Sequence, residues 1–168
     1  MSNAADRSRT YSWEDPMTGA QAARSMSGLD YLQALIDGKF PRPPISTTLD
    51  FVLVEVQEGR AIFECTPSEF HYNPIGVVHG GLAATLLDSA LGCAVQSTLP
   101  AGSGYTTVEL HVNLVRPVTM QSGRLRCQAD VIHVGRSMAT AQARLTDAAG
   151  KLYAHGTTTC MIFKVEST

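Results

Sequence analysis

The chain has 168 residues, with 13 Lys and Arg against 15 Asp and Glu, and its formal net charge is -2. This is the length of one domain with a substantial core, and the balanced charge without a basic cluster gives no indication of nucleic acid or an anionic membrane surface as a partner. The longest apolar run, residues 77–95, contains His79, three glycines and Asp88, so it is not predicted to span a membrane.

The first predicted element is a helix in residues 18–40. Its apolar residues recur at helical spacing, and we expect it to stop at Gly38 because the PRPP sequence beyond it blocks further helix. This single amphipathic helix is expected to pack on one domain that covers residues 17–168. Residues 1–16 are expected to be a disordered or tag-derived leader, and the opening MSNA is interpreted as an expression remnant.

Two strands joined by a tight turn are predicted next, in residues 49–67. The turn falls on the QEGR sequence, where Gly59 is free to take positive φ. A loop over residues 67–77 leads to a helix over about residues 79–97. This helix is apolar almost all round, which is typical of a helix at the centre of a protein.

Four strand-like runs follow the helix, in residues 105–118, 122–134, 137–147 and 151–165. The turn sequences between them are short, which predicts an antiparallel sheet. Sheet, one hydrophobic helix and then more sheet is an α+β arrangement in which the sheet wraps around the helix and buries it.

Asp88 is the one formally charged residue between positions 70 and 108, and it lies in the middle of the apolar helix. Burying a carboxylate costs free energy unless hydrogen bonds or opposite charges compensate. Local hydrogen bonds or contact with water would make Asp88 a purely structural residue. A lone charge on an apolar helix is more often functional, so we interpret Asp88 as a candidate catalytic group.

The cysteines and most histidines show no metal-binding pattern. Four cysteines, widely spaced and without a C-x-x-C pair, favour buried thiols in a reduced, cytoplasmic protein: Cys65, Cys93, Cys127 and Cys160. Four histidines have no ligand spacing and are assigned no catalytic work: His71, His111, His133 and His155. No metal site is therefore predicted, and no signal peptide is recognised at the start of the chain.

Several separated motifs also occur in a fixed order. N-P-x-G-x-x-H-G-G at residues 73–81 is followed by D-S-A-x-G from residue 88, then by TTVELHVNLVRPV, HVGR and DAAGKLYAHGTTTC. Over about residues 28–163 the chain resembles the hotdog-fold acyl-CoA thioesterases of the PaaI type. The resemblance implies an antiparallel sheet wrapped around a central helix, a CoA thioester substrate and no metal or redox cofactor. It also implies a homodimer, within a dimer of dimers, whose active sites lie between two subunits.

Thioester hydrolysis needs hydrogen-bond donors at the carbonyl oxygen, where negative charge develops, and a base or nucleophile at the carbonyl carbon. Free N–H groups converge at a helix start and glycine leaves room there, so Gly80 is the predicted donor, and Asp88 is the predicted base or nucleophile. Their separation is about 12 Å along a helix that rises about 1.5 Å per residue. One subunit cannot bring both to one carbonyl, whereas a two-fold partner with an antiparallel helix can.

Three further residues have both a functional and a structural interpretation. Asn73 could hold the nucleophilic water or the thioester carbonyl, or simply form the turn before Pro74. His79 could orient the loop and the thioester, or satisfy the helix start. Thr107 lies where related enzymes carry a hydroxyl that faces the catalytic carboxylate, although a β-branched residue is ordinary in a strand. Contacts with CoA are predicted for Gly81, Arg116, Gly135, Arg136 and Ser137.

Two alternatives to a thioesterase stay open. An enoyl-CoA hydratase of the same fold would carry Asp just before the Asn-Pro pair and His close after it, whereas here Tyr72 precedes Asn73 and His79 follows IGVV. A non-catalytic acyl-CoA-binding module is disfavoured, because binding alone does not require a carboxylate beside the thioester. No pattern indicates whether the acyl group is aryl, short or medium chain.

Overall fold

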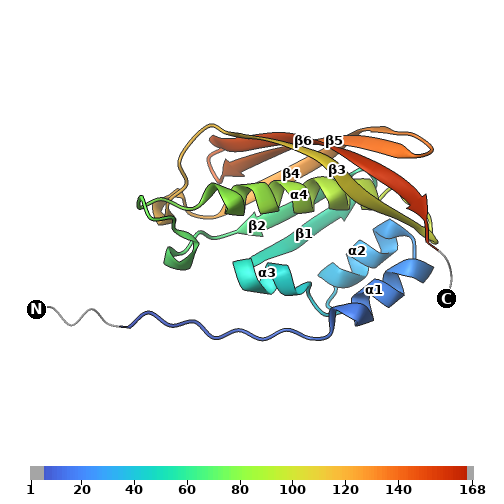
Figure 1. The fold of residues 1–168 in the computed structure, drawn as a ribbon, viewed down its shortest axis with the longest axis horizontal. Helices are drawn as coiled ribbons and strands as arrows, with labels where there is room; N and C mark the ends of the chain where they lie inside the picture. Colours follow the sequence, from blue (N-terminus) through green and yellow to red (C-terminus); the bar gives the residue numbers. More distant parts are fainter. Residues whose placement is uncertain (1–5, 166–168) are drawn as a thin grey trace, which may run out of the picture.

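The computed structural model describes residues 6–165, and its centre is one long helix, α4 (Gly80–Gln96), held in the curve of an antiparallel sheet (Figure 1). The six strands of this sheet are β1 (Phe51–Gln57), β2 (Arg60–Cys65), β3 (Ser103–Leu114), β4 (Leu125–Val134), β5 (Met138–Asp147) and β6 (Leu152–Lys164). Their order across the sheet is β1-β2-β4-β5-β6-β3. The predicted α+β hotdog fold is confirmed.

The helix lies close against the sheet because the inner faces of the central strands carry small residues. Buried alanines on β4 and β5 belong to the same core cluster as the helix: Ala129, Ala139, Ala141 and Ala143. Leu86, Leu87 and Leu91 of α4 have no exposed surface. Alternation of these inward residues with polar outward ones is what a sheet with one buried face requires.

Tight turns join β1 to β2, β4 to β5 and β5 to β6, whereas longer connections lead into and out of β3. Gly59 takes a φ of +76° between β1 and β2, as predicted for that turn. β3 instead follows α4 along the chain and pairs only with β6, so it forms an edge of the sheet. Its pairing register shifts between Thr107 and Glu109, where Val108 is 56% exposed. An edge strand leaves backbone groups free to pair with another chain.

The N-terminal region differs from the prediction of one helix that ends at Gly38. It forms α1 (Pro16–Ser25), α2 (Gly28–Ile36) and α3 (Pro44–Leu49). Met26 is extended, and the Ser27 side chain caps α2 by accepting a hydrogen bond from the Asp30 amide. The PRPP sequence was expected to block further helix, yet α3 begins at its last proline, Pro44. Proline is favoured in the first turn of a helix, because the N–H that it lacks would have no hydrogen-bond partner within the helix there.

α2 is fixed to the end of α4 by a close backbone approach. The Gly28 amide donates to the Leu99 carbonyl at 2.9 Å, and a Cβ at Gly28 would overlap the Gln96 carbonyl oxygen. This contact places α2 and α3 beside β1, on the side of α4 that carries Asp88 (Figure 1).

The segment before α1 lies extended beneath α3 (Figure 1). Arg7 forms an ion pair with Glu69 at 2.7 Å, and the Arg9 guanidinium donates to the carbonyl oxygens of Thr47 and Thr48. Residues 1–5 of the predicted N-terminal segment lie outside the described residues. The boundary between that segment, residues 1–16, and the domain therefore stays a prediction.

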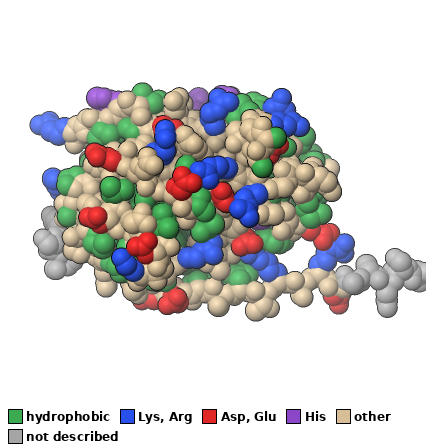
Figure 2. All heavy atoms as spheres, turned by 180° about the vertical axis from the view of Figure 1, so that it is seen from behind, with side chains coloured by type: hydrophobic (Ala, Val, Ile, Leu, Met, Phe, Trp, Pro, Cys, Tyr) green, Lys and Arg blue, Asp and Glu red, His purple; other side chains and the backbone are tan. Residues whose placement is uncertain are grey.

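Charged side chains of both signs are interspersed on the face seen in Figure 2. Ion pairs link strands of the sheet, including Arg60 with Asp130, and Arg126 with Glu55 and Glu64. Within residues 6–165, none of the helices has the length and apolar character that crossing a bilayer requires.

Candidate active site

The first turn of α4 has one backbone donor left over. His79 is the N-cap, and its Nδ1 accepts a hydrogen bond from the Gly81 amide at 2.8 Å. The His79 carbonyl accepts from the Leu82 amide at 3.0 Å. Within the described part of the chain, the Gly80 amide donates to no acceptor. It is therefore the N–H group that remains available to a ligand at this helix terminus.

Hydrogen bonds hold the conformation of the loop before α4. His71 is buried, its Nδ1 accepts from the Ser68 amide at 3.0 Å, and its Nε2 lies 2.8 Å from the Leu49 carbonyl oxygen. Because Nδ1 accepts from an amide it carries no proton, so Nε2–H donates to the Leu49 carbonyl, and desolvation lowers the pKa of His71 in the same sense. The His71 carbonyl in turn accepts from the His79 amide at 2.8 Å, which fixes the start of α4.

Asn73 forms the turn in this loop. Its Oδ1 accepts from the amides of Ile75 at 3.0 Å and Val77 at 3.3 Å, which is an Asx turn. The carboxamide oxygen is thereby occupied, and the side-chain NH2 group is the part of Asn73 that can still contact a substrate.

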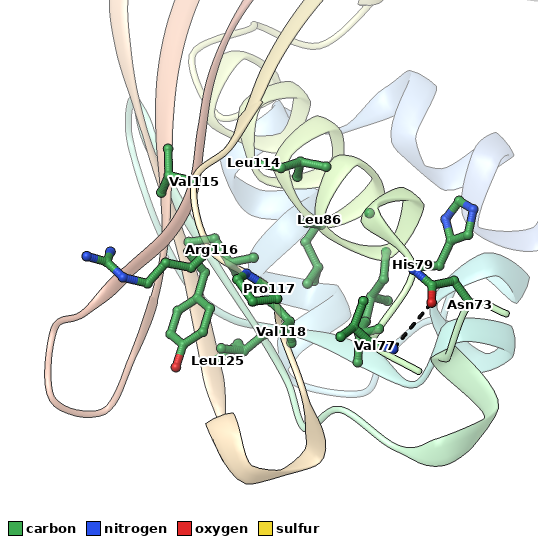
Figure 3. A pocket seen from close by; sticks show the side chains of 16 residues that line it. Asn73, Val77, His79, Leu86, Leu114, Val115, Arg116, Pro117, Val118 and Leu125 are labelled. Carbon is green, nitrogen blue, oxygen red and sulfur yellow. Dashed lines mark hydrogen bonds between the residues drawn. The ribbon is translucent and has the colours of Figure 1, made fainter. Parts of the chain in front are cut away.

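Asn73, His79 and Gly80 line a cavity of about 260 Å³ at the start of α4. Leu114, Arg116 and Val118 form its opposite wall. Figure 3 shows Asn73 and His79 on one side of this cavity and Arg116 on the other, with the guanidinium directed away from the interior. Arg116 donates to the Leu152 carbonyl, which holds it in that orientation.

Asp88 lies about two turns further along α4. Its Oδ1 accepts a hydrogen bond from the Thr107 hydroxyl at 3.0 Å, so Thr107 does face this carboxylate. Oδ2 has no hydrogen-bond donor among the described residues. The carboxylate is thus held in one orientation with an oxygen left for chemistry.

One face of α4 is not covered by its own sheet. Its residues recur at helical spacing and are partly or fully exposed: Gly81, Ala84, Thr85, Asp88 and Ser89. Apart from Asp88, the residues of this face are small. Strand β3 runs beside the face, and its Thr107 contacts Asp88. The helix that was predicted to be apolar almost all round therefore has one face of small and polar residues that its own sheet does not cover.

Asp88 lines a second cavity, of about 280 Å³, on the side of α2 and α3. The two cavities have no lining residue in common, so within one chain Asp88 and Gly80 open into different spaces. The separation of about 12 Å expected from helix geometry agrees with this division.

The comparisons with known proteins match this architecture to one family. A model of the thioesterase superfamily matches residues 75–154. Human acyl-coenzyme A thioesterase 13 is 33% identical over 105 residues, which are 62% of this chain and 74% of that protein. The chain belongs to the thioesterase superfamily. It is thus a thioester hydrolase of the PaaI type.

Further relatives agree with this assignment. A phenylacetic acid degradation-related protein of Ralstonia eutropha superposes with a TM-score of 0.70 at 30% identity, over 78% of this chain and 98% of that one. The PaaI protein of E. coli has the same TM-score at 20% identity, over 86% of this chain and 99% of its own, and shows the fold. A 1,4-dihydroxy-2-naphthoyl-CoA hydrolase of Listeria monocytogenes is 24% identical over 108 residues, 64% of this chain and 86% of that protein.

In this thioesterase, the residues predicted to contact CoA lie in two separate places, at opposite ends of the sheet. Arg116 and Gly81 lie near the start of α4, whereas residues 135–137 form the turn between β4 and β5. The Ser137 carbonyl accepts from the Ile162 amide at 2.9 Å, and Ile162 pairs with Tyr105 on β3. This turn therefore lies toward the C-terminal half of α4, beyond Asp88.

Sequence reasoning missed the residues that surround Asp88 in the thioesterase. Cys93 and Tyr105 line its cavity, and the Tyr105 hydroxyl lies against Gly92, where a Cβ would overlap it. No local signal marks these contacts, because they join α4 to a strand more than ten residues away. Within residues 6–165, no three His, Cys, Asp or Glu side chains are placed to share a metal ion.

Burial makes the Cys93 thiol a poor nucleophile. Desolvation first, and the Asp88 charge second, raise its pKa to about 12, and burial raises that of Cys127 to about 12 and that of Cys65 to about 11. At pH 8 a thiol with a pKa of 12 is ionised in roughly one molecule in ten thousand. These are the opposite of the conditions that activate a catalytic cysteine.

We expect iodoacetamide at pH 8 to alkylate the folded protein at least ~100-fold more slowly than the same protein in guanidinium, because only thiolates react. Mass spectrometry of tryptic peptides would give the rate at each cysteine. Rapid labelling of Cys93 in the folded protein would contradict the raised pKa.

Proposed function

We propose that the chain hydrolyses acyl-CoA thioesters to a free acid and CoA at a site shared by two subunits. In this site the Gly80 amide of one subunit binds the thioester carbonyl oxygen, and Asp88 of the other acts on the carbonyl carbon. One observation carries the proposal: the free Gly80 amide and the oriented Asp88 carboxylate lie on one helix but open into separate cavities.

The exposed face of α4 and the free edge of β3 support a two-fold partner. Antiparallel pairing of two β3 edges would extend the sheet and set two α4 helices side by side. The small residues at positions 81, 84, 85 and 89 allow close approach of the partner helix. Antiparallel helices bring residue 80 of each to residue 88 of the other, which yields two equivalent sites. Association of two such dimers into a tetramer is part of the same proposal.

The chemistry then follows from the geometry. The Gly80 N–H, at the positive end of the α4 dipole, stabilises the negative charge that develops on the carbonyl oxygen. The free Oδ2 of Asp88 takes a proton from the attacking water or attacks the carbonyl carbon itself, while the Thr107 hydroxyl holds Oδ1. The thiolate of CoA then leaves, and after direct attack a water molecule hydrolyses the anhydride between the acyl group and Asp88 to release the free acid. No metal or redox step is needed.

The remaining predicted residues position the substrate. The Asn73 NH2 group binds the attacking water or the thioester, and His79 sets the direction of the Gly80 amide by capping α4. Gly81, Arg116 and the turn at residues 135–137 contact CoA.

The test is a panel of acyl-CoAs assayed for release of free thiol. Hydrolysis of saturated acyl-CoAs is the expected result. Loss of the enoyl absorbance of a 2-enoyl-CoA without thiol release would instead identify a hydratase. Saturable binding of acyl-CoA without turnover would identify a binding module.

Replacing Asn73 or His79 with alanine is expected to lower turnover by about tenfold, less than the loss of Asp88, because these residues position the reacting groups. Asparagine is a good N-cap, so His79→Asn keeps an acceptor for the Gly81 amide and should recover most of the His79→Ala loss. Thiol release per folded molecule gives the comparison. A change in melting temperature alone, with unchanged turnover, would make both residues structural.

A further inference from the structure

The cavity beside Asp88 continues away from the reacting groups, beneath α2 and α3. Asp88 lines one part of this cavity, and most of the other lining residues are apolar. Only Asp88, Ser89, Cys93 and Tyr105 of this lining come from the part of the chain that the superfamily model matches. The rest belongs to residues 32–63, so this wall is supplied by the segment before the matched region.

The outer wall is formed by α2, α3 and the first two strands. The hydrocarbon side chains in it are those of Leu32, Leu35, Pro43, Ile45, Phe51, Val52, Leu53 and Phe63. The Phe51 and Phe63 rings also contact each other, with centroids 5.7 Å apart. The approach of Gly28 to the Gln96 carbonyl holds α2 against the end of α4 and so fixes this part of the wall.

Three polar side chains of this wall are neutral or hydrogen-bonded. Desolvation raises the pKa of the Cys93 thiol to about 12 and raises that of the Tyr105 hydroxyl well above its usual value. Arg42 donates to the Phe51 carbonyl at 2.6 Å. Because most of its lining is hydrocarbon, the cavity favours a hydrocarbon group that extends from a carbonyl held at Asp88.

The volume sets the size of that group. An apolar protein cavity of about 150 Å³ accepts benzene, which has six carbons. At the same volume per carbon, about 280 Å³ accommodates roughly ten to eleven carbons. A palmitoyl chain exceeds this space, and an acetyl group leaves most of it unfilled.

We propose that this cavity is the acyl-binding pocket, that it takes an apolar acyl group of about ten carbons, and that Leu35 forms part of its wall. The proposal rests on the thioesterase function proposed above. Leu35 lines the cavity yet is only half-buried and lies outside the main core cluster, so its replacement changes the pocket more than it changes folding.

The experiment measures kcat/KM for saturated acyl-CoAs from two to sixteen carbons. The wild-type protein should be most active on octanoyl- or decanoyl-CoA, and at least ~10-fold less active on acetyl- and palmitoyl-CoA. Leu35→Trp fills part of the pocket and should lower the octanoyl-to-butanoyl ratio of kcat/KM by about tenfold or more. Leu35→Ala enlarges it and should move the optimum to longer chains. Gln33→Trp, which adds the same ring on the exposed face of α2, is the matched control and should keep the wild-type profile.

The outcomes separate this inference from the function on which it rests. A wild-type protein that hydrolyses none of the series contradicts the thioesterase proposal itself. If the protein hydrolyses the series but neither Leu35 variant changes the chain-length profile, the acyl pocket alone is overturned. The same holds if Gln33→Trp changes the profile as much as the Leu35 variants do. An optimum at palmitoyl-CoA overturns the size limit. If Leu35→Trp does not fold, the direction of the Leu35→Ala shift decides.

Discussion

Replacing Asp88 with asparagine is expected to lower thioester turnover at least ~100-fold in a protein that still folds, the scale expected for loss of a general base or nucleophile. Asparagine has the size of aspartate, and its oxygen can still accept the hydrogen bond that the Thr107 hydroxyl donates at 3.0 Å. It has no negative charge with which to take a proton from water or to attack the carbonyl carbon. Thiol release from the best acyl-CoA of the panel measures the loss.

The controls separate chemistry from folding. Asp88→Ala should lose a similar amount of activity, whereas Asp37→Asn, which neutralises an exposed carboxylate at the end of α2, should keep wild-type turnover. Circular dichroism and the melting temperature establish that each variant folds. Substantial turnover by a folded Asp88→Asn protein would exclude this residue as base or nucleophile.

The sequence was sufficient for the central part of the fold because its patterns there are long and local. The apolar run of α4 and the alternating strands on either side predicted the order of the elements. The break between α1 and α2 was missed because it depends on a contact between segments far apart. Gly28 approaches the Gln96 carbonyl, which the local pattern around Ser27 does not reveal.

The candidate site, like the fold, could be predicted from the sequence only where its features are local. Gly80 and Asp88 could be predicted because a helix start and a lone carboxylate are local features. The pairing of Asp88 with Thr107 was suggested by family resemblance, not by any pattern in the strand itself. The cavity that joins Leu35 to Cys93 has no counterpart in sequence, because packing alone brings α2 beside α4.

The Gly80 amide can be deleted while the start of α4 is kept, by replacing Gly80 with proline. Proline lacks the N–H and suits the first helical position, and the residue before it must be extended, as His79 is with φ -62° and ψ 132°. Gly80→Ala is the matched control, since it keeps the N–H. In both variants the new Cβ would lie 2.5 Å from Cδ1 of Leu114, an exposed side chain that can move. Turnover by Gly80→Pro should be ~100- to 1000-fold below that of Gly80→Ala.

Mixing Gly80→Pro with Asp88→Asn subunits then tests whether the site is shared. Each variant alone is nearly inactive, but in a heterodimer one site carries both defects and the other carries neither, because each site takes its Gly80 and its Asp88 from different subunits. After complete exchange half of the dimers are mixed and each has one intact site of two, so roughly a quarter of wild-type activity should return. Native mass spectrometry of differently tagged subunits verifies the exchange. Sites contained within one chain would regain no activity. If no activity returns after verified exchange, the shared site is rejected, and so is the placement of Gly80 and Asp88 on opposite sides of one thioester.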